Sequence, residues 1–286
     1  MELSVCLAKC EKMIRTGSSS FYHAFRLLPS PRKEAVFVIY AFCRLIDNSV
    51  DEPEKSPFTL EELESQFLRL ETSNGHFIWP SLRWLFANFA VDPGSFIRQM
   101  IGQRRDLKLT HYDTVAQLEE YCYLVAGTVG EMLLPVLHDH PTEHVIEAGI
   151  YLGKAMQIVN IVRDVGEDQL RGRRYLPREL MDQQGYSAQK FAEGRVDDTF
   201  IGLIDNLSSL ARLWFDYGLQ RLDAYPASSA FSVELAAGYY RAILDEIVAN
   251  RYDVFSKRAV VGTAAKLEIF NNLKRKYMPS IKELAR

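Results

Sequence analysis

Apolar residues recur at helical spacing along almost the entire chain. The segment 35–50 is apolar on nearly all sides, as expected of a buried helix, and the segment 60–70 has one apolar face. There is no sustained alternation of apolar and polar residues, which a half-buried β-strand would require. Because only helices are left to bury the apolar side chains, the sequence predicts an all-α fold.

Short breaks that contain Pro and Gly divide the chain, and no long linker separates two parts. Asp92, Thr114 and Thr142 can each cap the N-terminus of a helix, the first of them followed by a proline. The longest expected helices cover residues 114–137, 142–165, 200–222 and 232–252. We therefore predict a single domain over residues 1–286, built from roughly ten to twelve helices.

The composition argues against several classes of protein. Thirty-four Lys and Arg residues nearly balance 37 Asp and Glu residues, and the net charge of −3 argues against a nucleic-acid-binding protein. The longest apolar runs fall short of the ~18–20 residues of a membrane-spanning helix. Early charged residues argue against a secretory signal, and the four cysteines form no CxxC pair. We expect a cytoplasmic protein, with contact at a membrane surface left open.

One pattern of acidic residues occurs twice. The two copies are Arg44 with Asp47 and Asp51, and Arg163 with Asp164 and Asp168. Residues four apart on a helix share a face and lie ~6 Å apart along its axis, where like charges destabilise the helix. Both copies lie in otherwise apolar segments, so we expect the carboxylates to point into the protein. The arginines supply part of the necessary counter-charge, and Mg²⁺ would supply the rest beside phosphate oxygens.

A single acidic pair of this kind is usually a solvent-exposed helix face. Its repetition in two apolar segments, each with a nearby arginine, favours a functional interpretation. Gln157 and Asn160 lie upstream on the same helix face as Asp164, where their amide oxygens can bind a metal or their amide groups a phosphate.

Two further features fit a diphosphate ligand with an apolar tail. The loop of residues 17–21, Gly-Ser-Ser-Ser-Phe, offers hydroxyl and N–H groups to an anion, although serine clusters are more often simple caps. The segment 121–130 has small residues at positions 126, 127 and 130. Those positions indicate either close helix packing or the wall of a ligand tunnel.

Taken together, these motifs resemble the squalene/phytoene synthase family over most of the chain. The matching segments are Ser18-x-Ser20-Phe21, Tyr40 to Asp51, Tyr121 to Gly130, Gln157 to Asp168 and Gly172 to Pro177. Within the family, the chain length and the amino-acid sequence of residues 121–130 look most like those of the bacterial dehydrosqualene (4,4′-diapophytoene) synthases. The resemblance implies an isoprenoid synthase fold, with helices around a central cavity.

The resemblance also implies a role for each matching residue. The two acidic motifs would face each other across the cavity mouth and hold two or three Mg²⁺ ions. The implied metal ligands are Asp47, Asp51, Asn160, Asp164 and Asp168. The implied catalytic residues are these aspartates with Arg163 and Tyr121. The implied contacts with the diphosphate substrate are Gly17, Ser18, Ser19, Ser20, Phe21, Tyr40, Arg44, Gln157, Tyr240, Arg258 and Lys266.

The implied reaction joins two farnesyl diphosphates head to head, through presqualene diphosphate, to dehydrosqualene, an early step of carotenoid biosynthesis. It requires Mg²⁺ and no NADPH. Alternatives within the class are a phytoene synthase acting on geranylgeranyl diphosphate and a squalene synthase using NADPH. A terpene cyclase and a non-catalytic helical protein that binds prenyl lipids also stay open. We expect Phe25 or Phe37 to limit the substrate length, and we expect no obligate protein partner.

Overall fold

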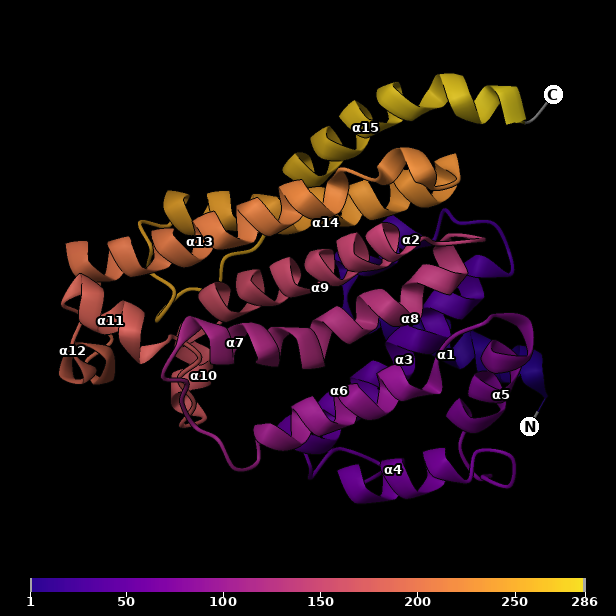
Figure 1. The fold of residues 1–286 in the computed structure, drawn as a ribbon, viewed down its shortest axis with the longest axis horizontal. Coiled ribbons are helices and arrows are strands. Elements are labelled where there is room, and N and C mark those ends of the chain that lie inside the picture. Colours follow the sequence, from indigo (N-terminus) through magenta and orange to yellow (C-terminus); the bar gives the residue numbers. More distant parts are fainter. Residues whose placement is uncertain (1, 285–286) are drawn as a thin grey trace.

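The computed structural model describes residues 2–284 and shows an all-helical fold (Figure 1). Within this range there is no β-strand, only an isolated bridge between His111 and Arg174. The helices are α1 (Leu3–Gly17), α2 (Ser19–Phe25), α3 (Arg32–Asp51), α4 (Leu60–Leu68), α5 (Ile78–Asn88), α6 (Pro93–Arg105), α7 (Val115–Cys122), the π-helical turn η1 (Tyr123–Gly127), α8 (Thr128–Leu137), α9 (Glu143–Arg163), α10 (Val165–Leu170), α11 (Arg178–Gln184), α12 (Ala188–Ala192), α13 (Asp198–Leu219), the 3₁₀ turn η2 (Leu222–Ala224), α14 (Ala227–Ala249) and α15 (Thr263–Leu284). The all-α prediction is confirmed, but its helix number was too low because short helices such as α2, α10 and α12 lack a clear periodic pattern.

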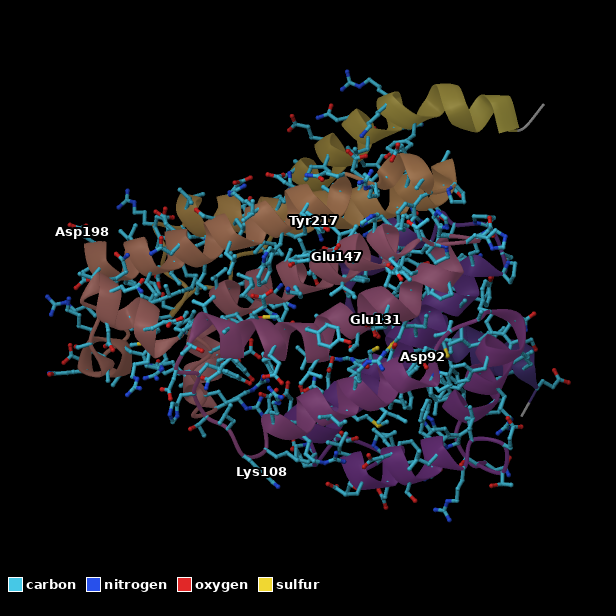
Figure 2. The ribbon with its side chains drawn as sticks, in the orientation of Figure 1. Asp92, Lys108, Glu131, Glu147, Asp198 and Tyr217 are labelled. Atoms are coloured by element: carbon cyan, nitrogen blue, oxygen red, sulfur yellow. The ribbon has the colours of Figure 1, made fainter. Side chains whose placement is uncertain are left out.

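The most apolar helices occupy the centre of the molecule. In Figure 1, α9 lies between the α13–α14 layer and the line formed by α7 and α8. By length and apolar composition α9 would pass as a membrane-spanning helix, but 56% of its apolar window is buried inside the fold. Its outer edge is tied to α13 where the Tyr217 hydroxyl donates to Glu147 at 2.5 Å (Figure 2). The high hydropathy of α9 therefore reflects its central position.

Capping explains where several helices begin. Asp92 accepts a hydrogen bond from the Gly94 N–H at the start of α6, as the sequence predicts. Thr114 forms a capping box with Gln117 at the start of α7. Thr142 precedes α9 with extended backbone angles but makes no side-chain cap bond.

The helix expected over residues 114–137 is interrupted by a π-helical turn. Helix α7, the turn η1 and helix α8 follow one another without a break. The extra residue of the π turn rotates the side chains of α8 relative to those of α7. Just before this turn the Tyr121 side chain is buried, and at its start the Tyr123 hydroxyl donates to Glu131 at 2.9 Å. Turns of this kind often lie at functional sites.

The second acidic motif does not lie on one continuous helix, contrary to the prediction. Helix α9 ends at Arg163, and Asp164 has non-helical backbone angles before α10 begins at Val165. The Gly166 N–H donates to the Val254 carbonyl, and a Cβ on Gly166 would lie 2.4 Å from the Phe255 carbonyl oxygen. The break therefore depends on a contact with a segment about 90 residues away in sequence.

Helices α8 and α9 approach each other at glycines. A Cβ on Gly130 would lie 2.3 Å from the Gly149 carbonyl oxygen, and one on Gly153 would lie 2.1 Å from the Ala126 carbonyl oxygen. These residues also line the internal cavity described below. The small residues of segment 121–130 therefore serve both close helix packing and a cavity wall, which were the two interpretations of the sequence. Close packing of the two backbones leaves space on their inner side.

We expect Gly153→Ala to lower the free energy of unfolding by about 1–3 kcal/mol or more, because backbone atoms cannot move aside as a side chain can. The measurement is urea unfolding followed by circular dichroism. The matched control is Gly262→Ala, where an added Cβ meets nothing within 4 Å. Equal stability of the two variants would contradict the close-packing explanation.

Candidate active site

A cavity of about 590 Å³ lies inside the helical layers. It is lined from α3, α6, the α7–η1–α8 line, α9, α10 and α14. The residues that α3 contributes are Val36, Ile39, Tyr40, Cys43, Arg44, Asp47, Asn48 and Asp51. This spacing of three and four places them on one helix face. The same face is apolar near its start and acidic near its end.

The cavity therefore has one polar end and one apolar end. From Val36 to Asp51 the wall runs about 22 Å along α3, at 1.5 Å per residue. The polar end also contains Arg163, Asp164, Glu167, Asp168, Arg171, Arg173 and Arg258. The apolar end is lined by Leu133, Leu134, Leu137, Leu152 and Val233. A ligand with a charged head and a hydrocarbon tail matches this division.

The first acidic motif is partly buried, and side chains from other segments bind its carboxylates. Asp47 accepts a hydrogen bond from Gln103 Nε2 at 2.7 Å, and Asp51 accepts one from Arg173 Nη1 at 2.6 Å. Burial raises the pKa of Asp47 to about 7; the charge of Arg44 opposes this effect, and the charges of Asp51 and Asp106 add to it. The carboxyl of Asp47 thus lies where added positive charge would stabilise it.

The second motif shows the same division of roles. Asp164 is bound by Arg163 at 2.5 and 2.8 Å and by Arg258 at 3.0 Å. Burial raises the pKa of Asp168 to about 7, and the charge of Asp164 adds to the effect. In each motif, one aspartate has arginine partners and the other is a partly buried carboxyl that lacks a full counter-charge.

Arg171 connects the two segments that carry the acidic motifs. Its guanidinium lies 3.5 Å from Asp51 on α3 and 3.0 Å from Glu167 on α10. Residues more than 110 positions apart in sequence therefore meet at one end of the cavity. This arrangement agrees with the facing of the two motifs that the family resemblance implies.

The donors at this end fit a divalent cation. The Asn160 side-chain oxygen is buried without a hydrogen-bond partner, while its amide nitrogen donates to Gln157 at 3.3 Å. Oxygen donors of this kind, carboxylate and amide, are those that Mg²⁺ prefers. Within the described part of the chain, no three acidic, His or Cys side chains are close enough together to enclose an ion. Arginines are instead the partners of Asp51 and Asp164.

The Gly/Ser segment borders the polar end. Ser18 caps α2 by accepting from the Phe21 N–H at 3.3 Å, and a Cβ on Gly17 would lie 2.5 Å from the Tyr40 hydroxyl. Lys266 on α15 contacts the Ser19 hydroxyl at 3.0 Å. Ser19, Ser20 and Lys266 are not on the cavity wall, and the other residues predicted to bind substrate are. Their contact with a diphosphate stays a prediction.

Several aromatic rings line the cavity. The ring centroids of Phe21 and Tyr240 lie 5.8 Å apart, and those of Phe21 and Tyr40 lie 6.4 Å apart. Tyr121 is also on the wall, and burial is the main cause of its raised pKa. Phe25 lies on the wall as well, whereas Phe37 is buried behind it against Tyr22. Phe37 thus differs from the prediction, because its position on α3 is rotated from the cavity face.

Sequence reasoning missed a polar face on α6. Gln99, Gln103 and Asp106 are all buried and all line the cavity. Their spacing of four and three residues is a helix-face signal that was present in the sequence. Sequence reasoning also did not identify Arg171 and Arg173 as ion-pair partners of Asp51, because only the three-dimensional fold brings them together.

Comparisons with known proteins agree with this geometry. The family model "Squalene/phytoene synthase" matches residues 14–265. Chloroplastic phytoene synthases from an Oncidium hybrid cultivar and from Arabidopsis thaliana are each 37% identical over 91% of this chain, which spans 65% and 64% of their lengths, just under two thirds. The crystal structure of a dehydrosqualene synthase in complex with a ligand is 32% identical, with a TM-score of 0.91 over 97% of this chain and 98% of that one. The chain belongs to the squalene/phytoene synthase family.

Proposed function

We propose that the protein is a Mg²⁺-dependent prenyltransferase that joins two farnesyl diphosphates head to head through presqualene diphosphate to dehydrosqualene. The observation that carries this proposal is the cavity, which has two acidic motifs at one end and an apolar lining at the other. A prenyl diphosphate has the same division between a charged head and a hydrocarbon tail. The 32% identity and TM-score of 0.91 to a dehydrosqualene synthase support this choice of product.

The polar end would bind and activate the diphosphates. Mg²⁺, when bound by Asp47, Asp51, Asn160, Asp164 and Asp168, supplies positive charge for the leaving diphosphate. Arg44, Arg163 and Arg258 would contact diphosphate oxygens, and the arginines would exchange their aspartate partners for the substrate.

The apolar end would protect the cations that form when a diphosphate leaves. The allylic cation of one substrate is attacked by the double bond of the other, and loss of a proton closes the cyclopropane of presqualene diphosphate. A second ionisation and rearrangement gives a cation that ends as an alkene by losing a proton. Rings such as Phe21 and Tyr40 can stabilise positive charge, and the apolar wall excludes the water that would give alcohols.

A phytoene synthase acting on geranylgeranyl diphosphate is the second candidate. It is favoured by the phytoene synthases that are 37% identical to this chain. Both candidates share the reaction type and differ in the depth of cavity that the tail requires.

With farnesyl diphosphate and Mg²⁺, we expect purified protein to form dehydrosqualene, identified by mass, and NADPH to leave the product unchanged. Asp47→Ala and Asp164→Ala should each lower turnover by about 100-fold or more, because charge stabilisation at the leaving group is lost. Asp245→Ala, which removes an exposed partner of Arg212, is the control.

Several outcomes would overturn the assignment. Phytoene from geranylgeranyl diphosphate alone would select the second candidate, and squalene formed only with NADPH would select a squalene synthase. No product from either substrate, together with prenyl-lipid binding that both aspartate variants retain, would indicate a non-catalytic binding protein.

We expect Phe25→Ala to raise the yield of C40 product from geranylgeranyl diphosphate by roughly tenfold or more, because a bulky ring leaves the wall and a longer tail can enter. Product masses with C15 and C20 diphosphates give the measurement. Leu27→Ala, at a side chain that is 45% exposed, is the matched control. An unchanged product profile for Phe25→Ala would show that this ring does not limit substrate length.

A further inference from the structure

One buried hydrogen bond on the cavity wall has no part in the function proposed so far. Asp106 follows the last residue of α6, and Tyr121 lies near the end of α7. The Tyr121 hydroxyl donates to Asp106 Oδ2 at 2.7 Å. Both residues line the cavity, and only 3% of Tyr121 and 9% of Asp106 is exposed to solvent. The other carboxylate oxygen, Oδ1 of Asp106, is buried without a hydrogen-bond partner.

This bond decides which part of the Tyr121 hydroxyl faces the cavity. A phenol has one proton to donate, and an ionised carboxylate can only accept. With its proton directed to Asp106, the Tyr121 oxygen can offer only lone pairs to anything else within reach. Such a bond to a charged acceptor is roughly twice as strong as one between neutral groups, so the orientation is firmly held.

The rest of the Tyr121 side chain is already fixed by packing. Its ring lies 5.1 Å from the ring of Tyr175 and 5.2 Å from that of Tyr112, centroid to centroid. Rotation of the hydroxyl is therefore the remaining freedom of this side chain, and the Asp106 carboxylate accepts its proton, with the Tyr175 hydroxyl as the neighbouring neutral group.

We propose that Asp106 is a positioning residue that turns the Tyr121 oxygen lone pairs, rather than its O–H dipole, toward the cationic intermediates of the reaction. The inference rests on the proposed function, since only that function puts cations in the cavity. A lone pair directed at a cation stabilises it, whereas an O–H proton in the same place repels it. Asp106 acts through Tyr121 and makes no bond to the substrate itself.

The test is a double-mutant cycle on Asp106→Asn, Tyr121→Phe and the variant that carries both. Asparagine replaces the charged acceptor by a neutral amide that can either accept or donate, so the phenol proton is held less firmly and can turn toward the cavity. We expect each single variant to lose roughly 10- to 100-fold in hydrocarbon formation and to release more prenyl alcohol. Because Asp106 acts through Tyr121, the doubly substituted protein should be no worse than Tyr121→Phe.

Two controls separate positioning from a loss of structure. Glu120→Gln removes an exposed ion pair with Arg105, which joins the same two helices beside the buried bond, and should leave products and rate unchanged. Binding of farnesyl thiolodiphosphate, an analogue that does not ionise, should be the same in Asp106→Asn as in the unsubstituted protein. Thermal unfolding confirms that each variant is folded, and Asp106→Ser repeats the cycle if Asp106→Asn is not.

The outcomes distinguish this inference from the proposed function. If the unsubstituted protein forms no hydrocarbon, the proposed function fails and the inference fails with it. If it does, additive losses in the cycle or an unchanged alcohol fraction in Asp106→Asn would overturn the inference alone. Failure of both Asp106 variants to fold would assign the residue a structural role and overturn it as well.

Discussion

The structure depends on keeping several partly buried carboxylates together at one end of an apolar cavity. Such groups are stable only with a counter-charge, and here arginines from three separate segments supply it. Arg171 joins Asp51 to Glu167, and Arg258 reaches Asp164 from beyond α14. In the proposed function, these same arginines would exchange their carboxylate partners for a diphosphate.

The apolar part of the cavity has a separate structural origin. Glycines let α8 and α9 approach until their backbones touch, and the small residues on the inner side leave a wall without bulky side chains. Tyr121, at the end of α7, and the π-helical turn that follows it also line the cavity. Packing at the centre of the fold and the shape of the cavity are therefore determined by the same few residues.

Local sequence patterns predicted much of the fold and part of the site. The apolar periodicity of α3, the cap at Asp92 and the acidic face of residues 47–51 are local properties, and the structure contains all three. The helix break at Asp164 was not predictable, because it depends on the contact between Gly166 and Phe255. The same is true of the arginine partners of Asp51, which only the three-dimensional fold brings to it. The polar face of α6 was visible as spacing, but its meaning required knowing which side of α6 faces the cavity.

The central claim is that two acidic motifs, far apart in sequence, share divalent ions at the cavity mouth. Its most direct test is anomalous diffraction from crystals grown with Mn²⁺ and a non-ionising prenyl diphosphate analogue. The account predicts Mn²⁺ peaks between the carboxylates of α3 and those at the α9–α10 junction, each ion also bound to diphosphate oxygens. Peaks confined to one motif, or absent from this space while the analogue is bound, would contradict it.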